Sequence, residues 1–349
     1  MEFSGKPVTV AAASLRGLIP LEVFIPVRRK LPVVLALTAL LLTSACGSGS
    51  NDSSTKSDSS TSASQAVKVT GAIGTKPTVT FSTPLKVSKT STEVVTEGAG
   101  AKLTAGRQAL VHLFLENGTT GKPIGSTYDQ GTPTPLTLDA SNLPQPLVTA
   151  LEGKTQGSRV EVTSTAGDVY GKSGNSSLNL KPTDSLVIVF DILAVQPSDV
   201  LSGPKGSAKS VPSGLPSLVM KNGKVTTLDF SQAAKNPAKK LQVIPLVTGT
   251  GQKTTKQSLV TMDYLGQVYG TKKPFNNTYA AGKPATFPLG VGGLIKAWDQ
   301  ALVGMPVGSR VMLVAPPGVA YGKEGSKDGG IPKNATLVFV IDILGSSSQ

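Results

Sequence analysis

The hydrophobic residues in the C-terminal third of the chain fall in short runs that are typical of β-strands. Residues 258–266, 309–316 and 336–344 are rich in β-branched and other apolar side chains. The last run, "TLVFVIDIL", is apolar at positions that face both sides of a strand, as expected for a strand covered on both faces. We therefore expect a sheet in which 336–344 is a central strand.

One stretch between these runs has a different period. In "GLIKAWDQAL" (293–302) the apolar residues recur at i, i+1, i+4, i+7 and i+8, which places them on one face of a short helix: Leu294, Ile295, Trp298, Ala301 and Leu302. Gly304 and Pro306 follow directly and are typical helix-ending residues. Strands combined with one helix predict an α+β domain, in which an antiparallel sheet wraps around one short α-helix.

The same pattern occurs twice in the chain. A shift of 151 positions aligns residues 97–195 with 248–346 without a gap, so that "ALEGKTQGSRV" falls on "ALVGMPVGSRV" and "LVIVFDIL" on "LVFVIDIL". This period is far too long for a solenoid, so we predict two tandem copies of one globular domain. The copies are expected at 76–196 and 223–346, with the Pro-, Gly- and Ser-rich residues 197–222 as a linker.

The N-terminal residues have the layout of a targeting segment. Residues 27–50 contain a basic beginning, an apolar run that is too short to span a bilayer comfortably, and small residues before Cys46. We expect 1–45 to be a signal peptide, with translation starting at Val27. "TSAC" resembles a bacterial lipobox, although Leu42 lies one place further from the cysteine than is usual. The resemblance implies that Cys46 is lipidated; a plain signal peptide with a chance cysteine is the alternative.

The Ser- and Thr-rich residues 46–75 cannot bury apolar surface, and we expect them to form a disordered tether. With a lipidated Cys46, the protein would be extracytoplasmic and anchored to the cell membrane of a bacterium. The domain order expected is therefore a signal peptide, a tether, and two copies of one domain.

Composition restricts the chemistry that the chain can perform. Among 349 residues there are 38 glycines, 25 prolines, one cysteine and one histidine. A single cysteine excludes internal disulfides. One cysteine and one histidine also argue against zinc fingers, Cys–His nucleophiles and multi-histidine metal sites. The formal net charge is +13, but the basic residues are mostly scattered lysines without interleaved aromatic residues. This distribution argues against nucleic acid as a partner and favours a solvated surface facing anionic lipid or wall polymers.

Several short motifs follow one another in the second copy. After Tyr264 come "KPFNNT", "FPLG", "GLIKAWDQALVGMPVGSR", "AYG" and "IPKNATLVF". In this order they resemble the FKBP-type peptidyl-prolyl cis-trans isomerases over nearly all of residues 241–346. The resemblance implies two tandem FKBP-like domains, proline-containing polypeptides as partners, and no cofactor or metal; macrolide ligands remain open.

The same resemblance implies which residues form the site. They are Tyr264, Phe275, Asn276, Leu294, Ile295, Trp298, Tyr321, Ile331 and Phe339. The indole of Trp298 would form the floor against which a proline ring packs. The Ile295 amide and the Tyr321 hydroxyl would donate hydrogen bonds to carbonyl groups of the bound peptide.

Two residues depart from the family pattern. Asn276 stands where the family usually has aspartate, which keeps hydrogen-bonding capacity but removes the charge. Ala285 stands where the family usually has an aromatic residue, which opens one wall of the pocket. These changes motivate an alternative hypothesis, a surface lipoprotein that binds peptides or acts as a chaperone without turnover. A solute-binding lipoprotein, a third idea, would require two α/β lobes.

The first copy lacks the aromatic side chains. Six positions of the predicted site have a different residue in the first copy. Tyr264, Phe275 and Asn276 are replaced by Leu113, Ile124 and Gly125, and Ile295, Trp298 and Phe339 are replaced by Pro144, Leu147 and Ile188. Pro144 also removes a backbone donor, and Tyr170 is retained at the place of Tyr321. We therefore expect a degenerate, non-catalytic domain that serves as a spacer or as a peptide-binding platform.

Three further sequence features are expected to be structural. "GTGQKTT" (249–255) lacks the Gly-Lys-Ser/Thr of a phosphate-binding loop, and "YGKEGSKDGGIP" (321–332) lacks the ligand spacing of a calcium loop. In the family layout the second of these is a flap beside the pocket. His112 lies inside an apolar strand pattern and is expected to be a packed or edge histidine.

Overall fold

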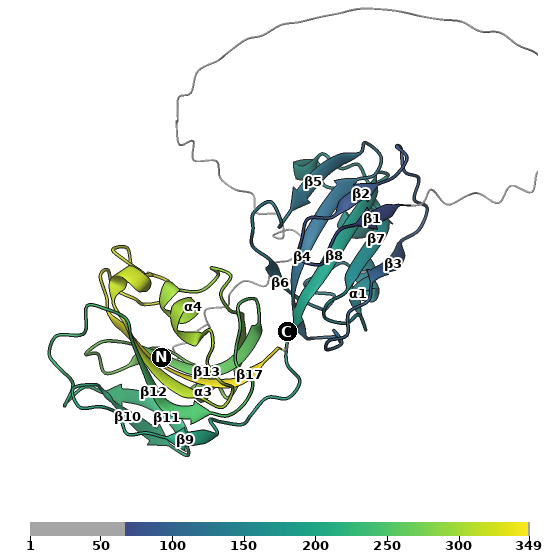
Figure 1. The fold of residues 1–349 in the computed structure, drawn as a ribbon. Helices are drawn as coiled ribbons and strands as arrows, with labels where there is room; N and C mark the ends of the chain where they lie inside the picture. Colours follow the sequence, from purple (N-terminus) through teal and green to yellow (C-terminus); the bar gives the residue numbers. More distant parts are fainter. Residues whose placement is uncertain (1–66, 348–349) are drawn as a thin grey trace, which may run out of the picture.

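The computed structural model describes residues 67–347, and they form two units that follow one another in the chain (Figure 1). The predicted signal peptide, Cys46 and the tether up to residue 66 lie outside the described residues. Within residues 67–347, the helices are all too short or too polar to cross a membrane.

The first unit is built mainly from antiparallel strands. In chain order its elements are β1 (Lys68–Thr70), β2 (Thr78–Thr80), β3 (Ser91–Thr96), β4 (Gln108–Asn117), β5 (Lys122–Ser126), β6 (Thr134–Thr137), α1 (Gln145–Leu151), β7 (Arg159–Thr165), α2 (Ala166–Tyr170), the 3-10 turn η1 (Ser176–Leu178) and β8 (Ser185–Val195). Its main sheet has the strand order β3-β7-β8-β4-β5, with β6 paired to β4.

The second unit repeats this arrangement. Its elements are β9 (Gly206–Ala208), β10 (Ser217–Lys221), β11 (Lys224–Asp229), β12 (Gln242–Gly249), β13 (Leu259–Val268), β14 (Pro274–Asn277), α3 (Thr278–Ala281), β15 (Ala285–Pro288), α4 (Lys296–Leu302), β16 (Arg310–Ala315), η2 (Pro317–Val319) and β17 (Leu337–Ser346). The main sheet has the order β14-β13-β17-β16-β12-β9, with β15 paired to β13.

The two main sheets are equivalent strand by strand. Read from the opposite end, β12-β16-β17-β13-β14 corresponds to β3-β7-β8-β4-β5. The register agrees as well, because His112 pairs with Asp191 on β4 and β8, and Asp263 pairs with Asp342 on β13 and β17. Both pairs are separated by the same 151 positions as the sequence repeat. The predicted central position of strand 336–344 is also observed, since β17 lies between β13 and β16.

Each main sheet is covered by a short helix on one face. Helices α1 and α4 begin at equivalent positions, after Pro144 and Ile295, whose backbones are both extended. In the second unit the buried face of α4 contributes Ala297, Trp298 and Leu302 to the core, where they meet inward-facing residues of β13, β16 and β17. The predicted helix at 293–302 is thus shorter at its beginning, because the glycine-rich stretch before Ile295 stays a loop. The short helices α2 and α3 were not expected, so each unit has more than one helix.

The other face of each sheet is covered by an unexpected β-hairpin. In the second unit β10 pairs with β11, and Val225 and Leu228 of β11 pack on Leu265 and Val340 of the sheet. In the first unit β1 pairs with β2, and Val69 lies in a cluster with residues of β4 and β8. Each unit is therefore a sheet enclosed between one helix and one hairpin.

These hairpins move two predicted boundaries. Strand β1 lies within the residues assigned to the tether, so the tether assignment up to 75 is wrong after residue 67. Strands β9 and β10 lie within the predicted linker 197–222, and β9 pairs with β12 of the second unit. The hydrophobic pattern concealed them because these strands bury few side chains.

A buried ion pair is repeated on the hairpin side of both sheets. Arg159 Nε lies 2.6 Å from Asp191 Oδ1, and Arg310 Nε lies 2.6 Å from Asp342 Oδ1. In the first unit the guanidinium also donates to backbone carbonyls of the β1–β2 connection, for example to Gly71 O at 2.8 Å. Both charges of each pair are removed from water. Loss of either side chain would leave the other charge buried without compensation, which is strongly destabilising.

His112 lies beside the first of these ion pairs. It is 6% exposed, its Nδ1 lies 2.8 Å from Thr127 Oγ1, and its ring stacks on Tyr128 at 4.3 Å. Burial lowers the pKa of His112 although Asp191 opposes this effect. The prediction of a packed histidine is confirmed.

Candidate active site

Five aromatic side chains meet on the helix side of the second sheet. The Trp298 ring lies edge-on to Tyr264, Phe339 and Phe287, at centroid distances of 5.0, 5.4 and 5.5 Å. Phe275 packs edge-on against Phe339 at 5.9 Å. These are favourable geometries for aromatic pairs, and we call these five residues the aromatic cluster.

The cluster is assembled from different elements. Trp298 comes from α4, Tyr264 from β13, Phe275 from β14, Phe287 from β15 and Phe339 from β17. Trp298 and Phe339 are 5% and 3% exposed, whereas the other three rings are partly exposed. The indole and Phe339 therefore form a floor, and the partly exposed rings stand around it.

Gly266 makes this arrangement sterically possible. A Cβ atom at Gly266 would lie 2.6 Å from Phe275 Cζ and 3.0 Å from Phe339 Cε1, closer than such contacts occur in proteins. Strand β13 therefore has to lack a side chain where the two rings cross it. The repeat places Leu115 at the equivalent position of the first unit, where it is buried.

Apolar residues of the neighbouring loops extend the cluster. Leu294 and Ile295, which precede α4, and Val319 and Ala320, near η2, are partly exposed and pack against the same core, as does the buried Ile331. The Ile295 amide has no acceptor among residues 67–347. The structure thus leaves one backbone donor beside the apolar floor.

Tyr321 lies at the edge of the cluster. It is 39% exposed, and burial raises the pKa of its hydroxyl. Burial and then the nearby Tyr321 raise the pKa of Tyr264 to about 12. Both hydroxyls therefore stay protonated at neutral pH and can donate hydrogen bonds.

The Trp298 indole has a polar atom without a partner. Its Nε1 is buried, and no hydrogen-bond acceptor lies near it within the described part of the chain. Burial of an unsatisfied donor costs free energy, on the order of 1–3 kcal/mol. The cluster therefore keeps an indole where an aliphatic side chain would cost less.

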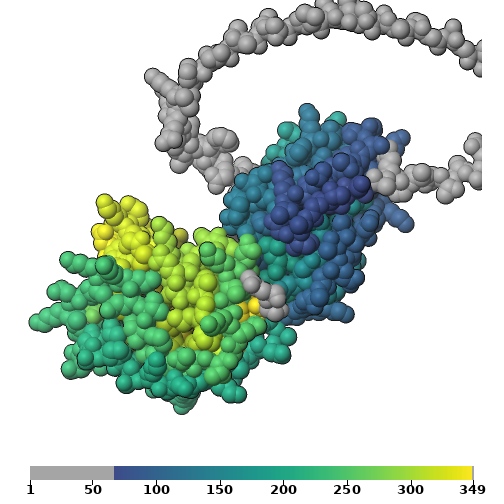
Figure 2. Space-filling model, in the orientation of Figure 1, coloured from purple at the N-terminus to yellow at the C-terminus, as the bar shows by residue number. Residues whose placement is uncertain are grey.

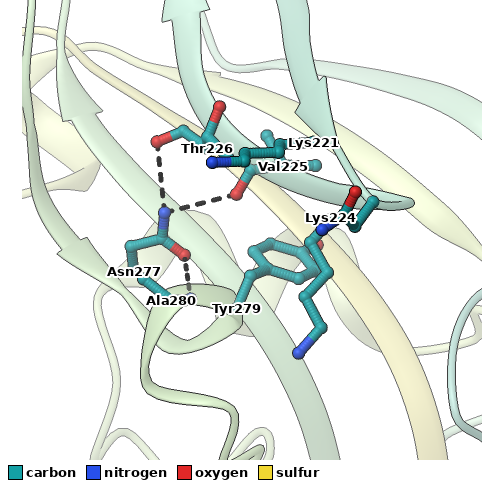
Figure 3. Close-up of a pocket in the computed structure, with 8 residues that line it drawn as sticks. Lys221, Lys224, Val225, Thr226, Asn277, Tyr279 and Ala280 are labelled. Atoms are coloured by element: carbon teal, nitrogen blue, oxygen red, sulfur yellow. Dashed lines mark hydrogen bonds between the residues drawn. The ribbon is translucent and has the colours of Figure 1, made fainter.

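Asn276, another residue of the predicted site, is partly buried on β14 and follows Phe275 directly. It pairs with Gly266 on the neighbouring strand, whereas the hydrogen bonds at this end of β14 are made by Asn277. Asn277 Nδ2 donates to Val225 O and Thr226 O, both at 3.2 Å, and its Oδ1 accepts from Ala280 N at 3.1 Å (Figure 3).

Asn277 lines a separate hollow of about 320 Å3, together with residues of the β10–β11 hairpin and of α3. Its Tyr279 and Val225 pack in the core on the hairpin side of the sheet, away from the aromatic cluster (Figure 3). Asn277 therefore fastens the hairpin to the sheet and takes no part in the predicted site.

A larger hollow lies beside α4 and η2. It has a volume of about 1060 Å3 and is bordered by residues 236–241, by Gln300 of α4, by residues 316–319 around η2, and by Thr336. Two of its residues, Leu241 and Val319, also pack against the hydrophobic core of the second unit, to which the aromatic cluster belongs. None of the five rings of the cluster lines this hollow.

The first unit has no comparable cluster. Leu147, Leu113 and Ile188 occupy the places of Trp298, Tyr264 and Phe339, and all three are buried in a core that is mostly aliphatic. Tyr170, the counterpart of Tyr321, is also packed, with its hydroxyl buried and its pKa raised to about 12 by burial. The equivalent space is thus filled by the protein itself.

The predicted site residues therefore divide into three groups. The structure brings seven of them into one hydrophobic cluster: Tyr264, Phe275, Leu294, Ile295, Trp298, Ile331 and Phe339. It places Tyr321 at the edge, and Asn276 follows Phe275 on β14. Sequence reasoning missed Phe287, although the motif "FPLG" contained it, and it missed Gly266. Among residues 67–347, no group of three or more His, Cys, Asp or Glu side chains is placed to hold a metal ion.

Comparison with known proteins agrees with this geometry. A family model of FKBP-type peptidyl-prolyl cis-trans isomerases matches residues 250–344. The FK506-binding protein of Streptomyces anulatus is 34% identical over 108 residues, which cover 31% of this chain and 87% of that protein. The chain belongs to the FKBP family of peptidyl-prolyl isomerases.

Two further proteins are similar to about a third of the chain. FK506-binding protein 2B of Rhizopus delemar is 38% identical over 117 residues, covering 32% of this chain but only 55% of that protein. The crystal structure of FkpA from Escherichia coli is 32% identical and covers 33% of this chain and 53% of that chain, with a TM-score of 0.29. The match spans about half the length of these two proteins.

Proposed function

We propose that the second unit catalyses cis-trans isomerisation of X–Pro bonds in polypeptides, with the aromatic cluster as its binding site. The observation that carries the proposal is the buried Trp298 ring, which packs edge-on against aromatic rings from three strands. Membership of the FKBP family supports it.

The chemistry requires no nucleophile, acid–base pair or metal. Rotation about an X–Pro bond opposes amide resonance, which gives a barrier of about 18–20 kcal/mol and makes the uncatalysed reaction take tens of seconds or longer. The planar amide is more polar than the twisted transition state, so removing water disfavours the planar form more. Each reduction of the barrier by about 1.4 kcal/mol accelerates the rotation tenfold.

The residues of the site have distinct roles in this mechanism. The proline ring packs on the indole of Trp298 between Tyr264 and Phe339, which fixes the ring while the preceding carbonyl rotates. The Ile295 amide and the Tyr321 hydroxyl donate hydrogen bonds to carbonyl groups of the substrate.

The decisive test is a protease-coupled isomerisation assay on proline tetrapeptides with the full chain and with Trp298→Leu. The substitution copies Leu147 of the first unit, and we expect kcat/KM to fall at least about tenfold while the fold is kept. Phe190→Leu, a buried aromatic change in the first unit, is the matched control and should leave the rate unchanged. Equal rates for Trp298→Leu and the wild type would overturn the assignment.

A second candidate function is polypeptide binding without turnover. Asn276 and Ala285 favour it, because the first lacks the charge and the second lacks the aromatic ring that the family usually has at these positions. In this case the wild type would bind proline peptides, detected through the fluorescence of Trp298, while its isomerisation rate stays at background. Family membership favours the catalytic function as the main proposal.

We further propose that the first unit is an FKBP-like domain without its own pocket. The equivalence of the two sheets and the aliphatic side chains at the positions of the aromatic cluster support this. The protein would then be a tandem FKBP in which isomerisation is confined to residues 223–346. Macrolide binding, suggested by the names of the relatives, would occur at the aromatic cluster.

We also propose that the protein acts outside the cytoplasm as a lipoprotein anchored through Cys46. The support is the sequence pattern of residues 27–50, which lie outside the described residues. Incorporation of radiolabelled palmitate into the wild type, and its absence from Cys46→Ala, would test this. Its substrates would be secreted chains whose maturation is limited by slow proline isomerisation.

A further inference from the structure

The two units touch through a small apolar cluster at the end of the first sheet. Leu110 of β4 and Ala194 of β8 are 0% and 1% exposed, and they pack with Leu259 of β13 and with Val291. Figure 2 shows the two units as separate bodies that meet along one side. This apolar cluster has four members, and its position decides what it can influence.

A hydrogen bond joins the units beside this cluster. Gln196 Nε2 donates to Thr286 Oγ1 at 2.9 Å, and Thr286 Oγ1 lies 2.8 Å from Thr261 Oγ1. Gln196 is itself held by Gln108, whose backbone N–H donates to Gln196 Oε1 at 3.1 Å and whose carbonyl accepts from Gln196 N at 2.8 Å. The donor from the first unit is thus held on both its backbone and its side chain.

Both contacts reach the segment that forms one wall of the aromatic cluster. Thr286 lies on β15 next to Phe287, and Val291 lies in the loop that continues to Leu294 and Ile295. The first unit therefore touches residues 285–295 at two points, Thr286 and Val291. Phe287, which packs against Trp298, lies between them.

The part of this segment that follows β15 is a loop rich in glycine. Gly290 and Gly292 have φ angles of 73° and 77°, in the left-handed region, and Gly293 follows. The Asp299 carboxylate accepts hydrogen bonds from Gly290 N at 2.8 Å and from Gly292 N at 3.2 Å. Within the described chain, Asp299 holds the loop from the side of α4, and Val291 holds it from the side of the first unit.

The residues of the contact are not common to the two copies. The repeat places Thr261 and Gly345 where the first unit has Leu110 and Ala194, and it places Gln108 where the second unit has Leu259. The three buried residues of the contact are thus replaced by a polar residue or by glycine in the other copy, and Val291 is replaced by the smaller Ala140. The contact is a feature of this pair of units and not of the domain in general.

The connection between the units is also fixed. Leu201 N donates to Leu344 O at 2.9 Å, and a Cβ atom at Gly345 would lie 3.1 Å from Pro197 Cγ. The chain after Gln196 therefore runs directly along the end of β17. This path holds the first unit against β13 and β15.

We propose that the first unit is a positioning element for the active site. It holds residues 285–295 through Gln196 and through the cluster of Leu110 and Ala194 with Val291, and so keeps Phe287 and Ile295 aligned with the indole. A copy without a pocket thus has a role in the function of its partner copy. The proposal rests on the proposed function only for its kinetic consequence.

The test uses the full chain with Gln196→Ala, Val291→Gly and both together. We expect amide hydrogen exchange at residues 289–295 to become about tenfold faster, and acrylamide quenching of Trp298 to increase. Trp298 is the only tryptophan in the chain, so the quenching reports on this site alone. For proline tetrapeptides we expect KM to rise about threefold to tenfold with a smaller change in kcat, because the wall is less pre-organised.

Two variants serve as controls. Ala140→Gly changes the loop of the first copy that is equivalent to Val291, and exchange at 289–295 should not change. Gln196→Glu keeps an acceptor for the Thr286 hydroxyl and should restore most of the protection that Gln196→Ala removes.

Unchanged exchange and unchanged quenching in folded Gln196→Ala/Val291→Gly would overturn the proposal. These two readouts do not need turnover. If the wild type has no isomerase activity, the proposed function fails, while the exchange data still decide whether the first unit holds the wall.

Discussion

At the scale of single residues, one missing side chain helps to explain why only the second copy has an aromatic cluster. Gly266 leaves room for the rings of Phe275 and Phe339 on strand β13. Its counterpart Leu115 fills that room in the first copy. A single added side chain can thus remove the space that the aromatic cluster requires, independently of the tryptophan.

We therefore predict that Gly266→Ala impairs the site. Its Cβ would lie 2.6 Å from Phe275 Cζ, so the ring has to move, at a cost of about 1–3 kcal/mol for overpacking. We expect kcat/KM on proline tetrapeptides to fall about tenfold or more. Gly203→Ala, where a Cβ meets no atom within 4 Å, is the control. Wild-type kinetics for Gly266→Ala would show that the two rings do not form part of the site.

A second prediction concerns pH. Burial and Tyr321 raise the pKa of Tyr264 to about 12, and burial raises the pKa of Tyr321. Both phenols are therefore protonated throughout the neutral range, since even an unperturbed tyrosine titrates only near pH 10. We expect kcat/KM to be constant between about pH 6 and pH 9. A bell-shaped profile measured with the same peptide would reveal a titrating group that this mechanism does not contain.

The residues of the site could be predicted to different degrees. Trp298, Tyr264 and Phe339 were recognised because their order along the chain resembles a family. Phe287 was missed because it lies two positions after Ala285, where an aromatic residue was expected. The role of Gly266 could not be predicted, because a missing side chain has meaning only once the two rings above it are placed.

At the scale of elements, the central strands and the main helix followed from their hydrophobic periods. The hairpins β1–β2 and β10–β11 could not be predicted in this way. Strand β10 buries no residue completely, and β11 buries only Val225 and Leu228. Because most of their side chains face water, their composition resembles that of a linker or a tether.

An element-scale prediction concerns Glu161 on β7. Glu161 is 6% exposed and lies opposite Glu93 of β3, and burial followed by repulsion from Glu93 raises its pKa to about 7. The second copy has Met312 at the equivalent position, fully buried. The first copy therefore contains a buried acid where the second has an apolar residue.

The sign of its effect on stability follows from the raised pKa. The folded state favours the protonated carboxyl, so stability is highest below the ordinary value of 4.5 and is lost as the pH rises through about 7. We expect Glu161→Gln to stabilise the first unit at pH 8, on the order of 1–3 kcal/mol, with little effect near pH 4. Urea unfolding at both pH values measures this, with the exposed Glu97→Gln as control. An equal effect at the two pH values would contradict the assigned titration.

At the scale of the whole molecule, the duplication has produced two units with different cores and a narrow contact. One apolar cluster and one side-chain hydrogen bond join them. Such a contact can fix a glycine-rich loop, which is held by few other bonds. It is too small to make two complete hydrophobic cores melt together, since each core contains many more buried side chains.

We therefore predict two separate unfolding transitions, which can be assigned because Trp298 is the only tryptophan. Calorimetry at pH 8 should resolve both, whereas tryptophan fluorescence should follow the second unit alone. Glu161→Gln should raise the midpoint of the transition that fluorescence does not detect and leave the fluorescence midpoint in place. If the fluorescence midpoint moved by the same amount, the units would unfold as one, and the first unit would stabilise the whole active-site domain beyond the wall formed by residues 285–295.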